Sequence, residues 1–204
     1  MAQPDHAERT AAYRAALTRR QEELGALLGQ VIPRDRPVVW EVGSGHGHFL
    51  TAYAAAHPGS FCLGVDLLGE RVERANRKRE RARLGNLVFL QAEARLFLDV
   101  LPPGIELTTT FVLFPDPWPK LRHHKHRILA PEFLRGVAAR TTPGGALHFR
   151  TDFQPYLQDA TAVVAADPAW RLSTEPWPFE YETVFQARSE SFGSFTARRV
   201  VSGH

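Results

Sequence analysis

Residues 38–47 read VVWEVGSGHG, and this stretch decides the class of fold. The apolar run at 38–42 predicts a buried strand, and the glycines that follow predict a tight turn into a helix. Glycine adopts backbone angles that other residues avoid, and it lets a ligand approach the chain with no side chain in between. A strand, a glycine loop and a helix in this order are typical of the ligand-binding edge of an open α/β sheet.

The rest of the chain alternates apolar, strand-like runs with helical segments. Further strands are predicted at 61–65, 87–91, 108–114 and 146–150, and helices at 5–29, 46–56, 69–84, 94–100, 131–140 and 153–166. This alternation predicts an α/β fold with a mostly parallel central sheet and helices on both faces. From Trp170 onward the chain holds aromatics and short β-like runs. Since no repeat or long linker divides it, residues 1–204 are expected to form a single domain, with 1–34 as an N-terminal helical extension and 35–204 as the catalytic core.

The composition excludes several classes of protein. With 44% hydrophobic and 23% charged residues, the chain is not expected to be disordered. No run approaches the roughly 20 apolar residues of a membrane span, and the start MAQPDHAERT does not resemble a secretory signal. The single cysteine, Cys62, cannot form an intramolecular disulfide. The protein is therefore expected to act in the cytoplasm and away from membranes.

Acidic residues accompany the ends of the first three strands. Glu41 precedes the glycine loop, Asp66 ends the second strand and Glu93 follows the third. An acid facing a pyrophosphate would be unfavourable, whereas one facing the ammonium or sulfonium of a methionine moiety is favourable. A carboxylate at Asp66 can accept hydrogen bonds from both hydroxyls of a ribose. Helix capping by Asp66 or Glu93, and a glycine turn used only for packing, remain the alternatives. The glycines of the loop, spaced G-x-G-x-G, are Gly43, Gly45 and Gly47.

A proline-rich loop follows the fourth strand, with the sequence FPDPWPK at 114–120. Its prolines fix φ and cannot continue the strand, so Asp116 is expected at the carboxyl edge of the sheet, opposite the glycine loop. Trp118 either stacks on a base or packs the loop into the core. Residues 120–127 hold four fixed positive charges, three histidines and no acid. Because two adjacent imidazoles rarely face one ion, no metal site is expected.

These motifs resemble those of class I S-adenosylmethionine-dependent methyltransferases. FPDPWPK followed by RHHKHR at 122–127 is similar to the signature of bacterial tRNA (guanine-N7)-methyltransferases. The resemblance covers residues 36–190. It implies a Rossmann-like class I fold, S-adenosylmethionine as the cofactor, tRNA as the partner, and methyl transfer to N7 of guanine 46 in the variable loop. It also implies that Asp116 is the catalytic residue and that the cofactor site is lined by Glu41, Gly43, Gly45, Gly47, Asp66, Glu93 and Asp116.

The resemblance also implies residues that contact the substrate. Lys120 and Asp152 are two of them, and the others belong to the segment TVFQARS at 183–189. Gln186 stands where the family has an acid, and Ser189 stands where it has a glycine. Glu93 likewise replaces an aspartate. The substrate residues implied in the segment are Thr183, Phe185, Gln186 and Arg188.

The chemistry of the implied reaction suits these residues. N7 of guanine has a free lone pair and no proton, so its methylation depends mostly on positioning. A carboxylate would stabilise the cationic product ring and can accept two hydrogen bonds from N1–H and N2–H₂ of guanine. Either Asp116 or Asp152 can do this. A methyltransferase of the same fold for another RNA or a small molecule stays open, as does a catalytically weak RNA-binding relative. The protein is expected to be a monomer or a homodimer.

The positive charge is concentrated in two basic tracts. The chain has 22 arginines, three lysines and a net charge of +3. Residues 71–83 carry +5 and residues 119–127 carry +4, which leaves −6 for the rest of the chain. The second tract adjoins Asp116, which points to RNA as the partner. The first tract is either a solvated helix face or a contact for the tRNA backbone.

Overall fold

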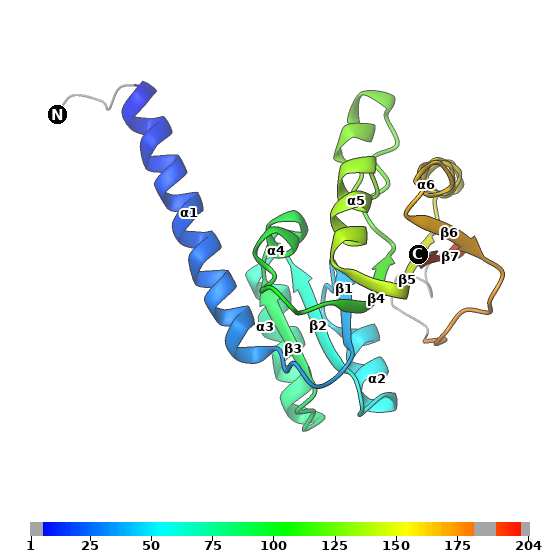
Figure 1. Cartoon of the computed structure of the whole chain (residues 1–204), viewed down its shortest axis with the longest axis horizontal. Helices are drawn as coiled ribbons and strands as arrows, with labels where there is room; N and C mark the ends of the chain where they lie inside the picture. The colour runs from blue at the N-terminus through cyan, green and yellow to red at the C-terminus, as the bar shows by residue number, and fades with distance from the viewer. Residues whose placement is uncertain (1–5, 182–190, 201–204) are drawn as a thin grey trace.

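The computed structural model describes residues 6–181 and 191–200 and contains one seven-stranded sheet (Figure 1). The order of the strands is β3-β2-β1-β4-β5-β7-β6. Strands β1 to β5 run parallel to their neighbours, and β7 is antiparallel to both β5 and β6. The predicted α/β fold is therefore confirmed. The strands are β1 (Val38–Val42), β2 (Phe61–Asp66), β3 (Leu87–Gln91), β4 (Leu107–Leu113), β5 (Thr141–Thr151), β6 (Trp170–Ser173) and β7 (Gly193–Arg199).

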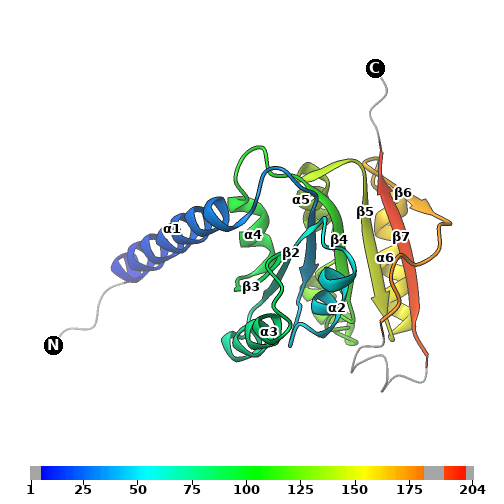
Figure 2. The ribbon, with the colours of Figure 1, turned by 90° about the horizontal axis from the view of Figure 1, so that it is seen from below.

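Helices cover both faces of the sheet (Figure 2). Helices α2 and α3 lie on one face, and α4, α5 and α6 lie on the other. The C-terminal end of α1 packs beside α4, while its N-terminal part extends away from the sheet (Figure 1). None of the described helices has the length and apolar character needed to cross a bilayer. The helices are α1 (His6–Val31), α2 (His48–Ala56), α3 (Gly69–Arg81), α4 (Ala94–Val100), α5 (Pro131–Ala139), α6 (Gln154–Ala166) and the 3-10 helix η1 (Leu121–His126).

Several boundaries differ from those predicted. Helix α1 continues past Gly29 to Val31, because a single glycine does not end a helix that is packed against a neighbour. Helix α2 begins at His48 and not at residue 46, since Gly47 has a left-handed φ of 68°. Strand β5 starts at Thr141 and includes an irregular stretch that reads as a turn in the sequence. The helix η1 was not predicted.

The core fixes the carboxyl ends of the central strands. Every residue of β1 and β2 is buried. On one face Trp40 packs against Phe97 and Phe133, with ring centroids 4.6 and 6.1 Å apart. On the other face Phe49 meets Phe111 at 4.9 Å. Since β1 lies between β2 and β4, the connections after β1 and β4 diverge, and a crevice opens between them.

Gly47 should tolerate no side chain. A Cβ atom there would lie 2.5 Å from Cζ of Phe89 and 2.8 Å from Cβ of Ala75, on a backbone with positive φ. We expect Gly47→Ala to lower the free energy of unfolding by about 3 kcal/mol, because overpacking adds to backbone strain. Gly43→Ala is the matched control, since its φ is +66° but no atom lies within 4 Å of its Cβ position. We expect Gly43→Ala to lower the free energy of unfolding, measured with urea, by only about 1 kcal/mol. An equal decrease in the two variants would contradict the conclusion that Phe89 and Ala75 leave no room for a side chain at position 47.

Candidate active site

An open cavity of about 810 Å³ lies at the carboxyl edge of the sheet, where the loops after β1, β2, β3 and β4 meet. Most of the residues predicted to bind the cofactor line it. Gly47 does not; it lies behind the glycine loop against Phe89 and Ala75. The predicted residues that line the cavity are Glu41, Gly43, Gly45, Asp66, Glu93 and Asp116.

The glycine loop is fastened to the end of β2. Gly43 and Gly45 have φ of 66° and 53°, which other residues rarely adopt. The Gly45 N–H donates to Oδ2 of Asp66, and the Leu68 N–H donates to Oδ1, each at 2.9 Å. Asp66 therefore joins the glycine loop to the start of α3 while it also lines the cavity. Each of its oxygens keeps acceptor capacity for a ligand.

Glu41 and Asp66 form a pair of buried acids in the cavity wall. They are 4% and 6% exposed, and Oε2 of Glu41 has no hydrogen-bond partner among the described residues. Burial first, and the charge of Asp66 second, raise the pKa of Glu41 to about 8. A cation bound here would compensate the charge of Glu41, whereas Asp66 already lies 3.9 Å from Nη1 of Arg71. The site therefore fits S-adenosylmethionine, since Glu41 would hold its ammonium group and Asp66 would accept hydrogen bonds from its ribose hydroxyls.

Glu93 caps helix α4. Its Oε2 accepts a hydrogen bond of 2.9 Å from the Leu96 N–H, and its side chain is exposed at the cavity wall. The helix-cap alternative considered for this residue is thus what the structure contains. The second carboxylate oxygen can still meet a ligand in the cavity.

The proline-rich loop holds Asp116 exposed at the rim of the cavity. Phe114 and Trp118, on either side of Asp116, have positive φ of 47° and 44°. Such angles cost non-glycine residues about 1–2 kcal/mol each, so packing must hold this backbone in place. The Phe114 N–H donates to the carbonyl of Arg150 at 2.8 Å, which ties the start of the loop to β5.

Trp118 lies in the cavity wall together with His126. The two ring centroids are 5.0 Å apart, and Trp118 is half-buried. Trp118 is therefore part of the site and not of the core. Sequence reasoning left this point open and did not identify His126 or His48 as residues of the cavity.

The predicted substrate residues are placed only in part. Lys120 and Asp152 are exposed and do not line the cavity. Asp152 follows β5, whose Arg150 is in register with Leu113 of β4, so both predicted aspartates lie at the same edge. The other predicted residues, Thr183, Phe185, Gln186 and Arg188, lie outside the described residues.

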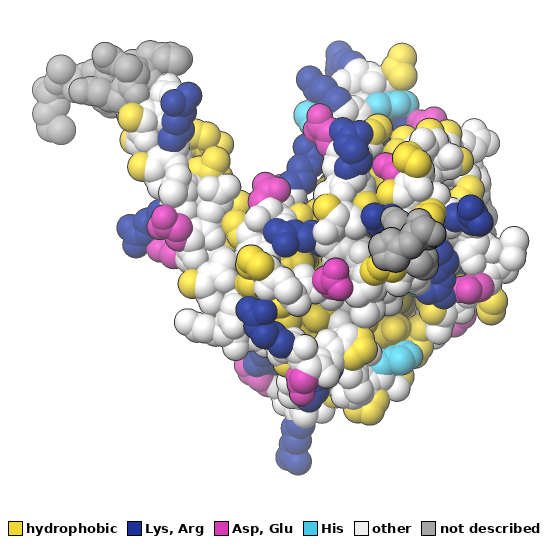
Figure 3. Space-filling model, viewed as in Figure 1, with side chains coloured by type: hydrophobic (Ala, Val, Ile, Leu, Met, Phe, Trp, Pro, Cys, Tyr) yellow, Lys and Arg dark blue, Asp and Glu magenta, His cyan; other side chains and the backbone are white. Residues whose placement is uncertain are grey.

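The cations of the two basic tracts differ from one another in exposure and in hydrogen bonding. Nζ of Lys78 donates to the carbonyl of His46 at 2.9 Å, and burial lowers its pKa. Arg127 is 4% exposed. Arg127 is therefore too buried to meet RNA phosphates, and Lys78 is half-buried and bound to the glycine loop. Other cations of the second tract are exposed, and Figure 3 shows basic and histidine side chains together beyond the end of α5. Within the described ranges no three His, Cys, Asp or Glu side chains form a metal-binding group.

Arg150 is a second buried arginine that sequence reasoning missed. It is 4% exposed, and both terminal nitrogens donate to the carboxylate of Glu180 at 3.0 Å. Its guanidinium lies 4.0 Å from the ring centre of Trp177 and 4.6 Å from that of Phe192. No signal in one sequence distinguishes such a residue from an exposed arginine.

Comparison with known proteins finds relatives over most of the chain. A family model described as "Putative methyltransferase" matches residues 35–190. A tRNA (guanine-N(7)-)-methyltransferase of Alkalilimnicola ehrlichii is 35% identical over 166 residues, which cover 79% of this chain and 70% of that protein. One from Halorhodospira halophila is 38% identical over 157 residues, covering 77% and 66%. About a third of each relative's length therefore lies outside the match.

A solved structure confirms the fold independently. The 16S rRNA methyltransferase KamB has a TM-score of 0.62 to this chain at 21% identity, covering 88% of this chain and 92% of that one. At this identity the likeness establishes the class I methyltransferase fold and nothing more. The family model and the more similar relatives settle the family. This chain belongs to the bacterial tRNA (guanine-N7)-methyltransferase family.

Proposed function

We propose that the protein transfers the methyl group of S-adenosylmethionine to N7 of guanine in tRNA, at position 46 of the variable loop. The observation that carries the proposal is the position of Asp116 at the rim of a cavity whose wall holds the buried acids Glu41 and Asp66. The names of the relatives support the substrate. The cofactor, when bound, supplies a methyl group activated by the positive charge on its sulfur.

The residues of the cavity divide between the parts of the cofactor. Glu41 pairs with the methionine ammonium, and Asp66 accepts hydrogen bonds from the ribose hydroxyls. Glu93 accepts a hydrogen bond from the adenine amino group through the carboxylate oxygen that does not cap α4. The backbone of Gly43 and Gly45 lets the cofactor approach closely, and Gly47 supports the loop from behind.

Asp116 is the catalytic residue of this proposal. Because guanine N7 carries a lone pair and no proton, no side chain has to act as a strong base. The Asp116 carboxylate orients the guanine by accepting hydrogen bonds from its N1–H and N2–H₂ edge, or stabilises the positive charge that develops on the ring. Asp152, at the same sheet edge, is the other carboxylate able to take one of these roles.

The tRNA contacts come from residues outside the cavity. Lys120, four residues after Asp116, is exposed and suits a phosphate or base contact. Thr183, Phe185, Gln186 and Arg188 are proposed to meet the substrate with Lys120 and Asp152. We place the activity in the cytoplasm. The protein is proposed to act as a monomer or a homodimer.

Methylation of tRNA transcripts tests the proposal. We expect tritiated methyl groups to be incorporated into an unmodified transcript and to map to 7-methylguanine at position 46. A transcript with adenine at that position is the matched control and should take up no label. Incorporation at another base, or into ribosomal RNA alone, would favour the alternative of the same fold acting on a different substrate. Salt-sensitive tRNA binding without methylation would favour a catalytically weak relative.

A further inference from the structure

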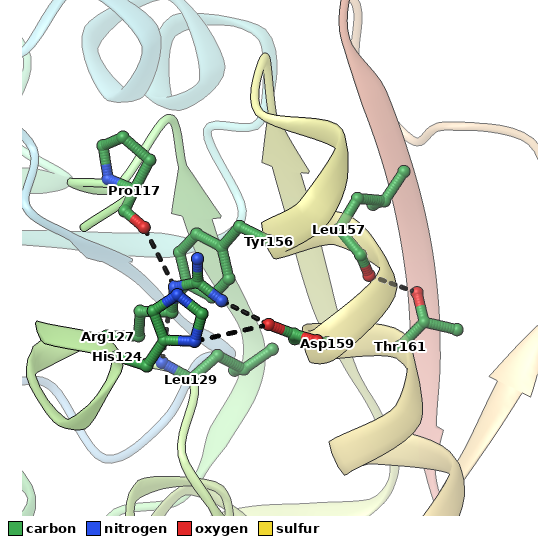
Figure 4. A network of polar contacts seen from close by, with 8 residues as sticks. All are labelled: Pro117, His124, Arg127, Leu129, Tyr156, Leu157, Asp159 and Thr161. Carbon is green, nitrogen blue, oxygen red and sulfur yellow. Dashed lines mark hydrogen bonds and ion pairs between the residues drawn. The ribbon is translucent and has the colours of Figure 1, made fainter. Parts of the chain in front are cut away.

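Arg127 is buried at the centre of a polar network beside the proline-rich loop (Figure 4). Its side chain is 5% exposed. Nε donates to the carbonyl of Pro117 at 2.9 Å, and Nη1 forms an ion pair with Asp159 of α6. The guanidinium also lies 4.7 Å from the ring centre of Tyr156. One side chain thus connects the loop after β4 to the helix after β5.

The contact with Pro117 anchors the middle of the loop, residues 115–119. Prolines remove three of the five backbone donors between 115 and 119. Across the described residues, none of the remaining N–H groups of this stretch donates a hydrogen bond to the protein, and the Pro117 carbonyl is its one hydrogen-bonded acceptor. Left-handed φ values at Phe114 and Trp118 make this backbone unfavourable unless it is held. The buried Arg127 guanidinium fixes this backbone at Pro117, one residue after Asp116.

The residues of α6 in this network, Asp159 and Tyr156, make further contacts with the chain around Arg127. Asp159 also lies 3.8 Å from Nδ1 of His124. The hydroxyl of Tyr156 accepts a hydrogen bond of 3.1 Å from the Leu129 N–H, just after the basic tract. Helix α6 therefore contacts the chain on both sides of Arg127, so the guanidinium cannot shift without disturbing these contacts (Figure 4).

We infer that Arg127 is a positioning residue, which acts through the Pro117 carbonyl to hold Asp116 at the cavity rim. The inference rests on the proposed function of Asp116. A displacement of about 1 Å in a reacting group can reduce the rate about a hundredfold. The cofactor residues Glu41 and Asp66 lie on β1 and β2, outside this network, so the loss of Arg127 should affect binding of S-adenosylmethionine far less than it affects kcat.

Arg127→Lys tests the inference, because lysine keeps the charge but cannot reach both Pro117 and Asp159 with a planar fork. Below the melting temperature, we expect kcat per folded molecule to fall ten- to a hundredfold, with the Kd for S-adenosylmethionine within twofold of wild type. Asp159→Asn should lower kcat in the same sense but less. Arg140→Lys is the matched control and should leave kcat unchanged, since Nε of Arg140 donates to the carbonyl of Leu98, away from the loop. Unchanged kcat per folded molecule in Arg127→Lys and Asp159→Asn would overturn the inference.

A second readout is independent of activity. In protein labelled with fluorotryptophan, the four tryptophans give separate ¹⁹F resonances, and Trp118→Phe assigns the one in the loop. We expect Arg127→Lys to shift or broaden the Trp118 resonance and to leave the other three in place. An unchanged Trp118 resonance would refute the positioning role even in a protein that methylates tRNA. Absence of methylation by the wild-type protein, together with a shifted resonance, would refute the proposed function alone.

Discussion

Asp116→Ala is expected to lower kcat about a hundred- to a thousandfold, while affinity for S-adenosylmethionine falls far less. Removing one group that stabilises charge in a transition state typically has an effect of this size. Asp116 is exposed at the cavity rim and forms no ion pair within the described part of the chain, so its removal should leave the fold intact. Steady-state methylation of a tRNA transcript, with cofactor affinity and melting temperature measured on the same samples, checks the result.

Two further variants make this prediction specific. Asp99→Ala removes an exposed aspartate of α4 that does not line the cavity, and it should turn over normally. The kcat of Asp152→Ala, compared with that of Asp116→Ala, shows which of the two aspartates contributes more to catalysis. If Asp116→Ala methylates tRNA at the wild-type rate, the catalytic role belongs elsewhere, and a large loss in Asp152→Ala would locate it.

Glu41→Gln should weaken cofactor binding about ten- to a hundredfold and yet stabilise the protein at alkaline pH. The Glu41 carboxyl has a pKa raised from 4.5 to about 8 by burial, with the charge of Asp66 as the second cause. Between these two values the unfolded chain loses the proton while the folded protein keeps it, so stability declines as pH rises from about 5 to 8. Each unit of pKa shift corresponds to about 1.4 kcal/mol, which makes the effect several kcal/mol by order of magnitude.

The measurement compares thermal unfolding and cofactor binding across pH. We expect Glu41→Gln to melt at a higher temperature than wild type at pH 8 and at about the same temperature near pH 5. Wild-type affinity should increase from pH 6 towards 8, as Glu41 becomes ionised and pairs with the ammonium group, and the variant should lack this increase. Glu106→Gln, which changes an exposed acid outside the cavity, is the control and should alter neither property. Equal melting curves for Glu41→Gln and wild type at pH 8 would contradict the raised pKa of the buried Glu41 carboxyl.

The fold could be predicted because its signals are local. Apolar runs and the glycine loop predicted β1 to β4 to within about a residue, and helices α3 to α6 within a few residues. The antiparallel strands β6 and β7 could not be specified, since the pairing of β7 with both β5 and β6 joins segments far apart in the chain. Helix η1 was also missed, because a run of histidines and cations carries no helical periodicity.

By itself the sequence determined the alternation of strands and helices and, with it, the meeting of Glu41, Asp66, Glu93 and Asp116 at one cavity. The reason is geometric: parallel neighbouring strands place their carboxyl ends at the same edge, so residues that follow them come together.

Only the tertiary structure decided which cations are buried or bound within the protein. Lys78 reaches the glycine loop across 32 residues, and Arg127 reaches Asp159 across 32, while neighbouring cations of the same tracts remain in solvent. Burial and pairing depend on contacts between distant segments, and a basic residue has the same appearance in the sequence whether it meets RNA or supports the loop that carries Asp116.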